Sequence, residues 1–118
     1  MISELVTRVF TRRDQAHLAH WATQSYTEHV ALDEFYNGVV GALDDIVENF
    51  QGCFKPIGRV NIPAFSTPKD VLTELKDDVK WITSHRSDIA KDIQHLENLI
   101  DNLTAVYTKT IYKLDNLS

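Results

Sequence analysis

Apolar residues recur at steps of three and four along the C-terminal part of the chain. The series is Ile93, Leu96, Ile100, Leu103, Tyr107, Ile111 and Leu114. Residues three and four apart share one face of an α-helix, whereas successive residues of a strand alternate between two faces. The spacing therefore predicts an amphipathic helix that must bury its apolar face against other elements.

The same spacing predicts three further helices. The first extends from Met1 to Trp21. The second begins at the capping box Ser25-Tyr26-Thr27-Glu28, in which the Ser25 hydroxyl accepts from the amide of Glu28, and ends near Gln51-Gly52. The third is expected to have Thr67 as its cap and Pro68 at its first helical position. Its inward residues are Val71, Leu72, Leu75, Val79 and Ile82.

A long connection is predicted between the second and third helices, because residues 52–68 contain all three prolines of the chain and two of its glycines. In a bundle, such a segment carries the chain back along the helices before the next one begins. With 118 residues, of which 43% are hydrophobic, the chain is expected to form one domain, residues 1–118, around one core. The predicted fold class is all-α, an antiparallel four-helix bundle of the ferritin-like type. Gly38 and Gly41 are expected where helices approach closely.

The charge balance argues against nucleic-acid binding. The formal net charge is −5, and no cluster of Lys and Arg begins or ends the chain. Thr11-Arg12-Arg13 is the one local basic group, and it is expected on a solvated helix surface. Cys53 has no second cysteine to pair with, and no apolar run has the length of a signal or membrane segment. We expect no membrane association and a reducing, cytoplasmic compartment.

Histidines and carboxylates occupy positions on the predicted inner faces of the first two helices. They are His17, His20, His29, Asp33, Asp44 and Glu48. A buried imidazole or carboxylate costs free energy unless it is hydrogen-bonded, paired or bound to a metal. Asp44 and Glu48 also lie near the negative end of the second helix, which disfavours carboxylates by roughly 0.3–1 kcal/mol each. A bound cation would remove both costs.

The spacing of these residues limits which of them can share an ion. His29 and Asp33 are four residues apart, as are Asp44 and Glu48, so each pair shares a helix face. His29 and Asp44 are fifteen residues apart, or about 22 Å along a straight helix. The two pairs therefore form either two separate sites or one site shared between two copies with antiparallel second helices. A two-fold interface would produce two equivalent shared sites.

The pattern resembles the signature of the mini-ferritins, the Dps-like proteins of the ferritin-like superfamily. The corresponding residues are His20-Trp21, His29, Asp33, Asp44 and Glu48. In that family the first histidine lies twelve residues before the second, which selects His17, whereas the adjacent tryptophan selects His20. The chain is shorter than a usual mini-ferritin and lacks the basic tail associated with DNA contact. Ser25-Tyr26 and Gln51-Gly52 also resemble a small ferritin-like family of bacterial and phage proteins.

The resemblance implies an iron-binding protein with a ferroxidase site shared across a two-fold axis. It also implies a homo-oligomer, from a dimer up to a dodecameric shell. Histidine and carboxylate ligands suit iron and would also bind zinc or manganese. The alternative is a non-enzymatic helical assembly or adaptor, phage-encoded, that uses the same residues as an interface hydrogen-bond network. Whether the chain is an enzyme stays open between these two hypotheses.

The remaining residues that could carry chemistry support neither hypothesis. Trp21 and Trp81 are expected as core or interface aromatics, and His85 as an exposed residue. Asp92 and His95 have the i, i+3 spacing of a di-iron ligand pair, but the apolar residues around them define a different inward face. The chain shows no nucleophile next to a base, no glycine-rich phosphate loop and no cysteine spacing for zinc.

Overall fold

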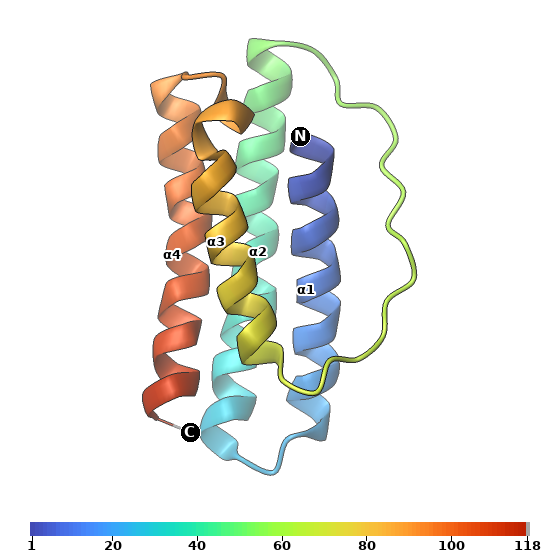
Figure 1. The fold of residues 1–118 in the computed structure, drawn as a ribbon, viewed down its shortest axis with the longest axis vertical. Coiled ribbons are helices and arrows are strands. Elements are labelled where there is room, and N and C mark those ends of the chain that lie inside the picture. Colours follow the sequence, from blue (N-terminus) through green and yellow to red (C-terminus); the bar gives the residue numbers. More distant parts are fainter. Residues whose placement is uncertain (118) are drawn as a thin grey trace.

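The computed structural model describes residues 1–117, and these residues form four helices and no strand (Figure 1). The helices are α1 (Ile2–Ala22), α2 (Tyr26–Cys53), α3 (Val71–Ala90) and α4 (Gln94–Asn116). The all-α prediction and the four-helix bundle are thereby confirmed. Ser118, the last residue of the predicted domain, lies outside the described residues. Within residues 1–117, no helix combines the length and apolar character needed to cross a lipid bilayer.

The predicted N-cap residue is correct for α2 and wrong for α3. The Ser25 hydroxyl accepts from the amide of Glu28 at 3.2 Å, as the capping box predicts. The third helix does not start at Thr67 and Pro68, because Asp70 is its N-cap. The Asp70 carboxylate accepts from the amide of Leu72 at 3.1 Å, and a carboxylate at this position is also favoured by the helix dipole.

Each helix packs against two others. α1 and α4 both contact α2, and both contact α3. Ion pairs connect the end of α3 to the start of α4, where Arg86 bonds Glu97 at 2.5 Å and Asp101 at 2.6 Å. At the opposite end of the molecule, Lys113 near the end of α4 pairs with Glu34 near the start of α2. Residues 54–70 contain no helix, and in Figure 1 they run alongside α1 from the end of α2 to the start of α3.

The core between the helices is mainly apolar, and it includes one buried charged group. Phe35 and Tyr107, both fully buried, meet edge to face with ring centroids 4.9 Å apart. Arg12, predicted on a solvated surface, is instead 6% exposed and forms two bonds of 2.8 Å to Asp78, which is completely buried. The prediction failed because a guanidinium can enter a core when a carboxylate meets its planar fork.

Gly38 and Gly41 of α2 differ in what surrounds them. A Cβ atom at Gly38 would lie 3.2 Å from a methyl carbon of Val106 on α4. A Cβ atom at Gly41 would meet nothing within 4 Å. The expected close helix approach therefore holds at Gly38 and is wrong at Gly41 within a single chain.

Candidate metal centre

His20 and His29 hold each other across the short turn between α1 and α2. Nδ1 of His20 lies 2.6 Å from the carbonyl oxygen of His29, and Nδ1 of His29 lies 2.8 Å from the carbonyl oxygen of His20. The two rings stack with centroids 3.6 Å apart and an interplanar angle of 18°. His20 is 8% exposed, whereas the His29 side chain reaches the surface. The turn is short enough to make this contact because Ser25 ends it by capping α2.

These two hydrogen bonds determine the tautomer of each neutral ring. A carbonyl oxygen can only accept, so Nδ1 must be the protonated nitrogen in both imidazoles. Nε2 then carries an unprotonated lone pair on each ring. Histidines that bind metals usually have one ring nitrogen donating to a carbonyl or carboxylate in this way, which orients the other nitrogen. Each Nε2 lone pair is therefore available to bind a cation.

His17, Tyr36 and Asp33 form a second layer next to this pair. The His17 ring stacks on Tyr36 with centroids 4.0 Å apart and lies 6.0 Å from the His20 ring. The Tyr36 hydroxyl donates to Asp33 at 2.7 Å, and this hydrogen bond is the main reason that the pKa of Tyr36 is raised. The structure thus groups four of the six predicted ligands at one end of the α1 and α2 pair. His20, and not His17, is the partner of His29.

Asp44 and Glu48 lie elsewhere and are exposed, so their expected place on the inner face of α2 is wrong within one chain. The reason is that the buried face of α2 is rotated slightly about the helix axis from the face expected. This buried face consists of Leu32, Phe35, Val39, Leu43, Ile46 and Phe50. Asp44 and Glu48 fall beside this face, and no Lys, Arg or His of residues 1–117 forms an ion pair with either. In the described part of the chain, no three His, Cys, Asp or Glu side chains are placed to hold a metal together.

One protein family matches the chain over residues 20–114, and its description is "Family of unknown function (DUF5856)". The chain belongs to this family. The matched range begins at His20 and includes His29, Asp44 and Glu48, but it does not include His17. No curated protein and no solved structure matches the chain.

Two groups of polar residues were not found from the sequence. The first is the buried set around Asp78, whose carboxylate accepts from Arg12, from Arg8 at 3.1 Å and from the Tyr107 hydroxyl at 2.8 Å. A signal for it exists, because Asp78 lies three residues after Leu75 and four before Ile82, both of which are buried. Val79 was expected at this inward position instead, and it is only partly buried.

The second group is the contact between Cys53 and His95, at the opposite end of α2 from the histidine pair. The Cys53 sulfur lies 3.4 Å from Nε2 of His95, and both residues are exposed. His85 is also not the fully exposed residue that was expected, because its ring stacks on Trp81 with centroids 4.4 Å apart. Neither contact involves the histidine pair.

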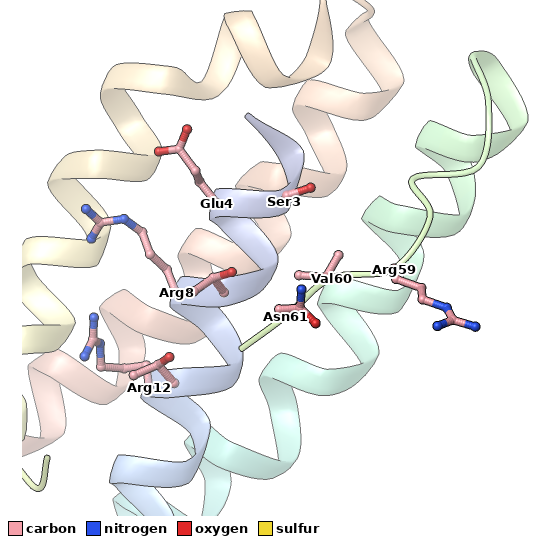
Figure 2. A pocket seen from close by; sticks show the side chains of 9 residues that line it. Ser3, Glu4, Arg8, Arg12, Arg59, Val60 and Asn61 are labelled. Carbon is pink, nitrogen blue, oxygen red and sulfur yellow. The ribbon is translucent and has the colours of Figure 1, made fainter. Parts of the chain in front are cut away.

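A hollow of about 490 Å³ lies between α1 and the connection and contains three arginines, but they do not converge on it. Arg8 and Arg12 are bonded to Asp78. Figure 2 shows Arg59 on the connection pointing away from both of them. This hollow therefore lacks the convergent free cations that an anion site requires.

Proposed function

We propose that this chain is an antiparallel ferritin-like bundle whose long connection follows α2, and that two copies bind iron at a site they share. The observation that carries the proposal is the reciprocal hydrogen bonding of His20 and His29, which leaves the Nε2 lone pair of each ring free to bind a cation. This is the tautomer that metal-binding histidines usually have, with one ring nitrogen held by a carbonyl or carboxylate.

The donor set fits iron when the second copy is included. His20 and His29 would supply nitrogen from one copy, and Asp44 and Glu48 would supply oxygen from the other. Asp33 and His17 would support this shell through Tyr36. The carboxylates cannot come from the same chain, because fifteen residues of helix separate His29 from Asp44 by about 22 Å. The same donors would accept zinc or manganese.

The shared site would bind Fe(II) as its substrate, and peroxide or oxygen would oxidise this Fe(II) to Fe(III). The contribution of the protein would be to hold the two imidazoles by their backbone bonds and to bring uncompensated carboxylates to the cation. The exposure of Asp44 and Glu48 without a cationic partner supports this role, because it leaves both free to bind.

The alternative proposal is a helical assembly without metal chemistry. The observation that favours it is the ion-pair network of Arg12 and Asp78, which satisfies the polar groups of the core with no metal. In that case the histidine pair serves only to fix the turn between α1 and α2.

The experiment that separates the two proposals is thermal unfolding with and without Fe(II), under anaerobic conditions, and with Mn(II). Binding to the folded state alone raises the midpoint, and a hundredfold excess over the dissociation constant adds about 2.7 kcal/mol. We expect wild type to gain stability and Glu48→Gln to lose the gain, because a neutral amide of the same shape is a poor ligand. His29→Gln should lose it as well.

The matched control is Asp45→Asn, which neutralises a neighbouring exposed carboxylate that the site does not use. It should retain the full metal-dependent gain. Equal metal-dependent shifts in wild type, Glu48→Gln and His29→Gln would exclude the shared site and leave the metal-free assembly.

A further inference from the structure

Trp21 is 68% exposed at the end of α1, which is unusual for so large an apolar side chain. It lies on the same side of α1 as Phe10 and His17, because these residues are separated by seven and four positions. Its ring contacts His17, with centroids 4.7 Å apart. Trp21 also lines a shallow hollow with Leu18 and Phe65, but these neighbours leave most of its side chain exposed next to the histidine pair.

A hollow of about 250 Å³ lies on the other half of the same α1 and α2 face. Its lining is mainly apolar and comes from α1, α2 and the connection. It includes Val6, Phe10, Leu43, Val47 and Val60, together with Asp44. The hollow thus offers an apolar floor and one carboxylate, which are the two features that an indole ring with its N–H can use.

In a two-fold pair of copies, Trp21 of one copy and the hollow of the other lie at the same level, that is, at the same position along the bundle axis. Because His20 and His29 bond each other, they share one level, and Trp21 lies at about the level of Glu28. A two-fold axis that brings His29 of one copy to Asp44 of the other pairs the level of Glu28 with the level of Asp45. The α2 residues of the hollow, Leu43 to Val47, bracket Asp45. The axis that assembles the shared site therefore also brings Trp21 to the hollow of the second copy.

We propose that Trp21 of each copy docks into this hollow of a second copy, and that its indole N–H donates to Asp44 there. The inference rests on the two-fold arrangement of the proposed function. A second copy is the occupant because each chain carries both halves of the contact at matching levels.

Crosslinking in the presence of a chelator tests the contact directly. In a Cys53→Ser background, Ala22→Cys, which is exposed and leaves Trp21 in place, is combined with Val47→Cys and treated with a short bismaleimide. Within one chain these positions are about twenty residues of helix apart in level, or about 30 Å, so a short reagent links them only between copies. We expect covalent dimers.

The matched control is Tyr112→Cys with Val47→Cys. Tyr112 is 56% exposed and lies on α4 next to Lys113, which pairs with Glu34 near the start of α2, so it belongs to the same end of the molecule but to a helix outside the α1 and α2 face. This pair should give no dimer. Dimers in both pairs, or in neither, would overturn the docking.

Truncation provides a second measurement, by sedimentation with the chelator present. Trp21→Ala should weaken dimer formation at least tenfold, because buried tryptophans dominate such contacts, whereas truncation of the exposed Tyr112 on α4, Tyr112→Ala, should leave it unchanged. Equal effects of the two variants would overturn the docking. If both docking tests fail but wild type still gains metal-dependent stability that Glu48→Gln loses, the docking is wrong and the shared metal site is retained. Crosslinking without any metal-dependent gain would instead retain the docking and exclude the metal site.

Discussion

At the scale of single residues, Asp78 is the side chain that connects three of the four helices. It is fully buried on α3 and accepts hydrogen bonds from Arg8 and Arg12 of α1 and from Tyr107 of α4. Burial by itself lowers the pKa of Arg12, but the bonds and charge of Asp78 outweigh it, so the pKa is raised. Burial, followed by the charge of Asp78, raises the pKa of Tyr107 well above its usual value. One carboxylate thus holds three helices together.

We expect Asp78→Asn to destabilise the fold by about 3–5 kcal/mol, because it removes the buried carboxylate that compensates the charge of Arg12 and leaves the more distant, partly exposed Glu74 at 3.4 Å to compensate it. The measurement is urea unfolding followed by circular dichroism. Asp101→Asn is the control, since Asp101 forms an exposed ion pair with Arg86 and should cost far less. Comparable losses in the two variants would show that the buried network does not stabilise the bundle.

The residue scale is also where the sequence was least informative. Periodicity placed Tyr107 in the core correctly, but it could not indicate that Arg12 enters the core, because the partner carboxylate is 66 positions away in the chain. The choice between His17 and His20 depended on the same kind of information. Only the path of the turn brings the carbonyl of His29 to Nδ1 of His20.

At the scale of the helices, the position of each helix start depends on which side chain reaches the free amides. Thr67 and Pro68 have the composition of a helix start, yet Asp70 binds the amide of Leu72 and also accepts from the Thr73 hydroxyl at 3.0 Å. A carboxylate that satisfies two donors outcompetes a threonine farther upstream. Apolar spacing therefore predicted that α3 exists and which residues it buries better than it predicted where α3 begins.

Substitution distinguishes the two caps. Asp70→Ala should cost about 1 kcal/mol of stability, because the amides of the first turn lose their acceptor. Thr67→Ala should change stability by less than about 0.5 kcal/mol, since Thr67 is exposed and precedes the helix. The difference is measured as a shift in the urea midpoint at constant slope. A larger loss for Thr67→Ala than for Asp70→Ala would contradict this account of the helix start.

At the scale of the whole molecule, the face formed by α1 and α2 has exposed polar and aromatic side chains. The α1 and α2 face presents the histidine pair and Trp21 at one end, and a hollow lined by Asp44 at the other. The opposite arrangement holds where α3 meets α4, because Arg86 is fully paired with Glu97 and Asp101. The face formed by α1 and α2 is therefore the one on which we expect a second copy.

This asymmetry predicts that the protein is not a monomer. A standard interface buries roughly 800 Å² on each partner, about an eighth of the 6683 Å² surface of this chain, which one helical face can supply. Light scattering at micromolar concentration should give a mass of at least two chains, and the unfolding midpoint should rise with protein concentration. Trp21→Ala should reduce both effects. A lone 13.5 kDa species with a concentration-independent midpoint would contradict the shared site and the docking together, since neither can form within one chain.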